Sequence, residues 1–130
     1  GLLAGVVANV CDTVSGLTVM QADMADMAAR FGMAPEAMMS MSVALPWIFV
    51  DFVLGLLVVW TYAAIRPRFG AGPRTALLAA MVSFVASTAV VFGFSNMGMM
   101  SSGAFVRSGL TAAVTFGLAG LAGCWLYKED

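Results

Sequence analysis

Three charged residues, Asp12, Asp51 and Arg107, stand inside apolar stretches long enough to cross a lipid bilayer. A charged side chain in hydrocarbon costs at least about 2.5 kcal/mol unless it is paired, protonated or reached by water. Residues of these types in these places could form an ion pair, hold a proton or bind a cation. They are therefore the first candidates for a functional site.

The depths of these residues predict one polar layer. A helix rises about 1.5 Å per residue, so eight residues correspond to roughly 12 Å. Asp12 and Asp51 each lie eight residues from the same-side end of their apolar stretch and are expected at one level. Arg107 begins closer to that side, and its long stem can reach deeper. The predicted buried polar layer consists of Asn9, Asp12, Asp51, Ser87, Thr88 and Arg107.

Three interpretations of this layer stay open. In the first, Arg107 pairs with Asp12 or Asp51, and the network fixes the packing of the helices. In the second, the two acids form a proton-coupled or cation-binding site, because two carboxylates and one guanidinium leave one negative charge over. In the third, the charges reach the membrane surface separately and never meet.

The elements that must position these residues are membrane helices. The 130 residues are 62% hydrophobic and only 10% charged, with a mean hydropathy of +0.97. Spans need about 20 apolar residues each. We predict an all-α, polytopic membrane protein, a four-transmembrane-helix bundle in a single domain, residues 1–130. The expected spans are 2–20, 43–65, 76–94 and 104–127, with an outer connector over 21–42.

Charge distribution predicts the topology. The segment 66–74 carries three of the six basic residues and no acid, so by the positive-inside rule it is cytoplasmic. Both termini then face the cytoplasm of a bacterial inner membrane, with Lys128 beside the end of the last span. The prolines and glycines of 66–74 are expected to keep either neighbouring helix from continuing through this segment, which is expected to form a tight, stiff turn. In the connector, apolar residues recur at helical spacing on one face of 22–31, and charged residues recur on another face. This pattern predicts a short helix on the outer surface that ends at Gly32. Pro35 then begins the next helix, and Pro46 bends the second span.

Small residues predict where the helices pack, because they let two backbones approach closely. The predicted helix-packing positions are Gly5, Gly55, Ala113, Gly117, Gly120 and Gly123.

Cys11 and Cys124 are expected at different depths, so no disulfide is expected between them. The chain opens at Gly1 inside an apolar stretch, and we expect residues to precede it in the native protein.

The chain resembles a group of small four-helix bacterial membrane proteins of unknown function. The similarity is carried by residues 60–75, WTYAAIRPRFGAGPRT, by an Asn-x-x-acid pattern matched at Asn9 and Asp12, and by residues 124–129, CWLYKE. It covers most of the chain. The resemblance implies a four-helix fold and supplies no mechanism.

Missing residue types exclude several functions. The chain has no histidine, so the usual haem ligand and the commonest general base are absent. No dithiol, nucleophile elbow or phosphate loop occurs, and no basic run suits nucleic acid. We therefore expect no enzyme activity, no metal and no cofactor, although lipid, quinone or pigment tails could lie between the helices.

Methionines suit Cu(I), but they also fill apolar contacts. Ten of them are expected on the outer side: Met20, Met24, Met27, Met33, Met38, Met39, Met41, Met97, Met99 and Met100.

The leading functional expectation is a non-catalytic accessory or structural subunit of a larger membrane complex. An energy-converting complex is the kind considered. Its partners would be other membrane subunits or a second copy of the chain, together with lipid. The alternative is a small homodimeric proton-coupled exporter that uses Asp12, as small multidrug transporters use an acid in their first helix. A second alternative, copper handling at the outer face, rests on the methionines alone.

Overall fold

The computed structural model describes residues 1–127, and every regular element in this part of the chain is a helix, which confirms the all-α prediction. The elements are α1 (Leu2–Leu17), α2 (Gln21–Arg30), the 3-10 helix η1 (Pro35–Met39), α3 (Met41–Phe69), α4 (Pro73–Asn96) and α5 (Ser102–Trp125). The expected position of Lys128 lies outside the described residues.

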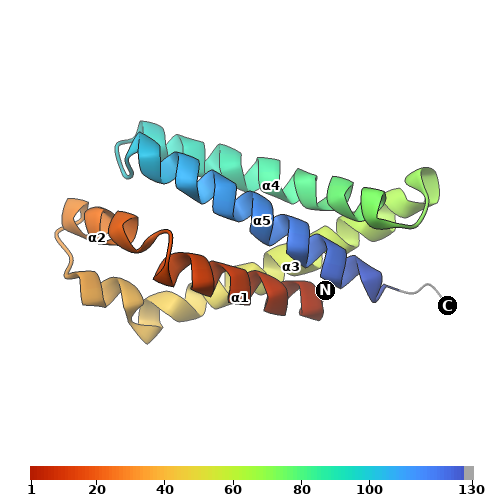
Figure 1. Ribbon diagram of the computed structural model, residues 1–130, viewed down its shortest axis with the longest axis horizontal. Helices are drawn as coiled ribbons and strands as arrows, with labels where there is room; N and C mark the ends of the chain where they lie inside the picture. Colours follow the sequence, from red (N-terminus) through yellow and green to blue (C-terminus); the bar gives the residue numbers. More distant parts are fainter. Residues whose placement is uncertain (128–130) are drawn as a thin grey trace.

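Three of these helices, α3, α4 and α5, are long and apolar enough to cross a membrane. The pair α1 and α2 reaches that length only together, and it is bent by 77° at the break between the two helices. Figure 1 shows α1, α3, α4 and α5 running along the length of the molecule, while α2 lies at one end beside the α4–α5 turn. We call this the α2 end. The opposite end, which carries Arg66, Arg68 and Arg74 around the α3–α4 turn, is the arginine end.

Neither neighbouring helix continues through the basic segment, as predicted, although α3 extends into it beyond the expected end of its span at residue 65. α3 continues through Arg66 and Pro67 to Phe69, and α4 begins at Pro73. Pro67 lacks one backbone N–H, but so close to the helix end this costs a single hydrogen bond. The reversal is confined to Gly70–Gly72, where both glycines have positive φ values of 81° and 138° that favour glycine. The Thr75 hydroxyl donates a 2.8 Å hydrogen bond to the Gly70 carbonyl and fixes the turn.

Very small residues form the core. A Cβ atom built on Gly55 would lie 2.4 Å from the Gly5 nitrogen, so the backbones of α1 and α3 are in direct contact. One on Gly123 would lie 2.6 Å from the Ala4 Cβ, and one on Gly120 would lie 2.9 Å from the Ala80 Cβ. Side chains packed in this core include Ala4, Ala8, Val58, Ala79, Phe116 and Ala119.

Two of the expected packing positions lie elsewhere. Ala113 is exposed, and a Cβ on Gly117 would meet no atom within 4 Å. Both residues line a shallow apolar groove between α4 and α5. Within the described chain, close backbone contact is therefore made at Gly5, Gly55, Gly120 and Gly123 but not at this pair.

Candidate functional site

Two acids from different helices lie side by side. Asp12 of α1 and Asp51 of α3 are neighbours across the α1–α3 contact. The hydroxyl of Thr115 on α5 donates a 2.8 Å hydrogen bond to Oδ1 of Asp12. Asp51 is buried, with 7% of its surface exposed, whereas Asp12 keeps an exposed side. We call Asp12 and Asp51 the carboxyl pair.

The pair can hydrogen-bond only if it holds a proton. An ionised carboxylate accepts hydrogen bonds and donates none. Two ionised carboxylates that lie side by side repel each other, and one proton shared between them would relieve that repulsion. A group that holds one proton between two acids can release it when a cation arrives.

Close contact between α1 and α3 explains how the two acids come together. Gly5 and Asp12 share a face of α1, and Gly55 lies one turn from Asp51 on α3, so the glycine contact sets the spacing of the acids. The Asn9 amide adds a bridge, because its Nδ2 atom donates to the Gly5 carbonyl at 2.9 Å and to the Ile48 carbonyl at 3.3 Å.

Arg107 is not part of this arrangement, which corrects the expected pairing with Asp12 or Asp51. Its guanidinium binds Asp23 of α2 with two parallel hydrogen bonds, Nε to Oδ2 at 2.7 Å and Nη2 to Oδ1 at 2.5 Å. The bend after α1 brings α2 to the start of α5 and offers Arg107 this carboxylate. Thr115, which marks the level of Asp12, lies eight residues further along α5, a distance of roughly 12 Å.

The Arg107–Asp23 ion pair favours the ionised form of the acid. Asp23 is 6% exposed. The hydrogen bonds from Arg107 lower the pKa of the Asp23 carboxyl below its ordinary value of 3.8. A second link fastens the other end of α2, since Nη1 of Arg30 donates to the Gly98 carbonyl in the α4–α5 turn at 3.1 Å. Arg30 also pairs with Asp26 of its own helix at 2.9 Å.

The two hydroxyl residues expected in the layer are not joined to the carboxyl pair. Ser87 and Thr88 are half-buried on α4, and within residues 1–127 neither hydroxyl bonds to Asp12 or Asp51. Sequence reasoning missed Thr115 and Asp23. Thr115 could have been found, since it falls two turns after Arg107 on one face of α5. Nothing in the sequence shows that Asp23 docks on a helix 84 positions away.

The methionines of the predicted outer side belong to the α2 end: they lie on α2, η1, the connecting loops, the first residue of α3 and the α4–α5 turn. Met97 is 71% exposed. Over residues 1–127, histidine, cysteine and acidic side chains form no group of three that could hold a metal ion. Cys11 and Cys124 are both free thiols.

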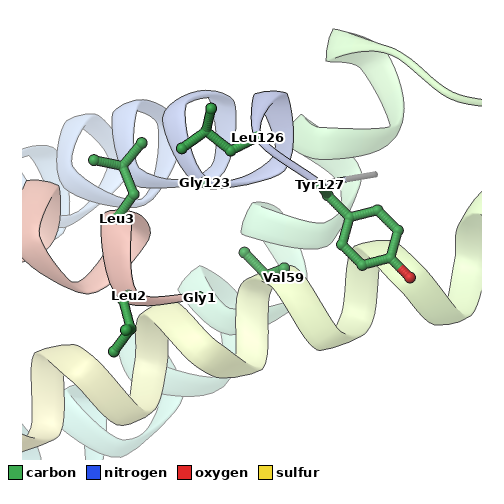
Figure 2. A pocket seen from close by; sticks show the side chains of 7 residues that line it. All are labelled: Gly1, Leu2, Leu3, Val59, Gly123, Leu126 and Tyr127. Atoms are coloured by element: carbon green, nitrogen blue, oxygen red, sulfur yellow. The ribbon is translucent and has the colours of Figure 1, made fainter. Parts of the chain in front are cut away.

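A pocket of about 380 Å³ lies near the arginine end, far from the carboxyl pair. Figure 2 shows Val59 of α3 and Tyr127 beside Gly1, with Leu126 at the end of α5. Tyr127 packs edge-on against Tyr62, and the Arg66 guanidinium lies 5.6 Å from the Tyr127 ring centre. The lining is apolar apart from this tyrosine and the chain start, so the pocket offers space for an alkyl chain and no catalytic group.

No protein-family model, curated protein or solved structure matches this chain.

Proposed function

We propose that this chain is a proton-coupled membrane carrier in which the carboxyl pair alternately holds a proton and a cationic substrate. The observation that supports it is the meeting of Asp12 and Asp51 inside the bundle while Arg107 is bound to Asp23. An arginine paired with either acid would have neutralised the site. Without that arginine, the charge of the pair can be balanced by a proton or by a cation from outside.

The unequal exposure of the two acids suits this exchange. Asp51 is buried and has Asp12 as its neighbour, whereas Asp12 keeps an exposed side through which an incoming ion can approach. Binding of a monovalent cation to the ionised pair displaces the shared proton, so charge stays constant while the two ligands exchange. Membrane-embedded acids commonly serve as such proton sites.

The topology that goes with this function has four crossings, by α3, α4, α5 and the bent pair of α1 and α2, in which α2 turns toward the membrane surface. α2 carries Asp23, Asp26 and Arg30 among its ten residues, a composition that suits a surface position. Gly1 lies beside Leu126 and Tyr127, so both ends of the described chain are close together. With the arginine end in the cytoplasm of a bacterial inner membrane, both termini would be cytoplasmic.

The test is proton-coupled transport by the purified protein in vesicles. Vesicles loaded with a pH-sensitive dye at acidic pH are given external tetraphenylphosphonium, a lipophilic cation. Proton release from the vesicles should accompany its uptake, and Asp12→Asn should abolish this release while the fold stays intact. Asp26→Asn, which removes an exposed acid of α2, is the matched control and should leave it unchanged. Equal fluxes in vesicles with wild-type protein and with Asp12→Asn would contradict the proposal.

A second candidate is the accessory subunit of a larger membrane complex, and the groove between α4 and α5 favours it. This groove of about 140 Å³ is lined by Leu77, Ala80, Met81, Phe84, Ala113, Phe116 and Gly117. Small residues left open on a membrane helix can receive a neighbouring helix. Gentle purification from native membranes separates the candidates, because co-migration with a large complex supports a subunit and a stable homodimer supports the carrier.

A further inference from the structure

α1 and α5 run in opposite directions and pack closely through small residues. A Cβ atom built on Gly123 of α5 would lie 2.6 Å from the Cβ of Ala4 on α1. Steps of four residues stay near one face of a helix, and two such steps lead along α1 from Ala4 to Asp12. Two steps back along α5 lead from Gly123 to Thr115. The 2.8 Å hydrogen bond between Thr115 and Asp12 shows that both paths end at the same level. The register of the α1–α5 contact therefore places the Thr115 hydroxyl on the Asp12 carboxyl group.

The two acids of the carboxyl pair differ in the donors that reach them. Thr115 is only 4% exposed, and its hydroxyl donates to Asp12. Asn9 lies one turn before Asp12, but its side-chain nitrogen donates to two backbone carbonyls and to neither acid. Within residues 1–127, no hydroxyl, amide or guanidinium group donates a hydrogen bond to Asp51. Only Asp12 is therefore stabilised by a neutral donor from another helix.

The other titratable groups of the four long helices do not supply a counter-charge to the pair. Cys11, next to Asp12 in the sequence, is a free thiol. On α1, α3, α4 and α5 the charged residues besides the pair are all arginines. They are Arg66, Arg68 and Arg74, which belong to the arginine end, and Arg107, which is bound to Asp23. Within the described chain, the repulsion between the two acids is therefore relieved by a proton.

We infer that Thr115 is a positioning residue that divides the roles of the two acids: Asp12 is the carboxylate that meets the substrate cation, and Asp51 holds the proton. A hydrogen bond donated to a carboxyl group favours its ionised form, whereas burial without a donor favours its protonated form. Asp12 has the donor and an exposed side, while Asp51 is buried without a donor. This inference rests on the proposed function, since it assigns the two ligands of that site to separate acids.

Infrared spectra of single variants test which acid carries the proton, without any transport measurement. The C=O stretching band of a protonated carboxyl group is the signal. At pH 7, Asp12→Ala should keep this band, because Asp51 remains buried without a donor. Asp51→Ala should lose it, because Thr115 still donates to Asp12. Any other pattern in these two variants would overturn the division of roles. Asp12→Asn and Asp51→Asn, which keep the size of the side chains, give the same comparison where an alanine variant does not fold.

Two substitutions of Thr115 in the Asp51→Ala background test its positioning role. Thr115→Val removes the hydroxyl at nearly constant shape, and Thr115→Ser keeps it as the matched control. On acidification, the Asp12 band should appear at a pH about one to two units higher with valine than with serine, the size expected for a hydrogen bond to a charged group. Equal pH values in the two variants would overturn the role of Thr115.

The spectra and the vesicle experiment can fail separately. The expected spectra, combined with no proton release from the vesicles, would overturn the proposed function and leave the division of roles standing. Proton release from the vesicles, combined with a band in Asp51→Ala at pH 7, would overturn the division and leave the proposed function standing.

Discussion

Arg107 and Asp23, 84 positions apart, form a two-bond ion pair that ties α2 to the start of α5. Its position explains two features of the molecule together. It holds a short polar helix against an apolar bundle, and it keeps the Arg107 guanidinium away from Asp12 and Asp51. The proposed function requires this, because an arginine bound to the carboxyl pair would neutralise it.

The first prediction is energetic coupling between Arg107 and Asp23. Arg107→Leu and Asp23→Asn should each lower the melting temperature in detergent by about 2–4 °C, and the double variant should be no less stable than either one. Each single change leaves an unpaired charge or a lost bidentate contact, and the second change adds no new loss. The same cycle with Asp12→Asn or Asp51→Asn should be additive. Coupling of Arg107 to either of these acids instead would contradict the structure.

A second prediction concerns acid. Because Arg107 lowers the folded-state pKa of Asp23 below 3.8, the pair stabilises the fold at all pH values above about 3.8. The stabilisation is lost as the pH falls through the lower folded-state value. Wild type should therefore melt above Asp23→Asn at pH 6, and the gap should close below about pH 4. A gap that does not narrow as the pH falls below 3.8 would show that it does not come from the ionised Asp23–Arg107 pair.

The glycines provide a third prediction with an internal control. Gly55→Ala should destabilise the protein by about 1–3 kcal/mol, since the new Cβ meets backbone atoms of Gly5 and Ala4 that cannot move aside. Gly117→Ala adds the same methyl group where no atom lies within 4 Å, and in a helix it should be neutral or stabilising by up to about 1 kcal/mol. Unfolding in mixed micelles measures both, and equal losses would contradict the α1–α3 contact.

A fourth prediction is the orientation. Single cysteines replacing Ala71, in the α3–α4 turn, and Ala34, in the loop before η1, both occupy exposed positions at opposite ends. In intact cells a membrane-impermeant maleimide should label Ala34→Cys and not Ala71→Cys. Labelling of the Ala71 position from outside would reverse the topology.

Local sequence rules predicted much of the fold. The contacts of the candidate site could not be predicted in this way, because they join helices that are distant in the sequence. The spacing of Met24, Met27 and Phe31 predicted a helix over 22–31, and the structure has one at Gln21–Arg30. The third helix runs past its predicted end at residue 65 to Phe69, because a proline in the last turn, such as Pro67, does not stop a helix as it would in a helix interior. Depth counting placed Asp12 and Asp51 at one level, and the structure brings their carboxyl groups together.

Arg107 shows why the rest could not be predicted. The depths of the charged residues were estimated from the four spans alone, and the helix over 22–31 was treated only as a segment on the membrane surface. The partner of Arg107 depends on the 77° bend at residues 18–20, which swings α2 toward α5. No periodicity along the chain encodes that angle. Thr115 could have been placed on the same face of α5 as Arg107, but its contact with Asp12 depends on how α1 and α5 are rotated against each other.

The most direct test of the account is whether the carboxyl pair holds a proton at neutral pH. A protonated carboxyl group has a C=O stretching band in the infrared that a carboxylate lacks, and the band shifts in heavy water. The account predicts such a band in the wild-type protein at pH 7, its loss in the double variant Asp12→Asn with Asp51→Asn, and its retention in Asp26→Asn. A wild-type spectrum at pH 7 without this band would show both acids ionised, and the shared proton on which the proposed function depends would not exist.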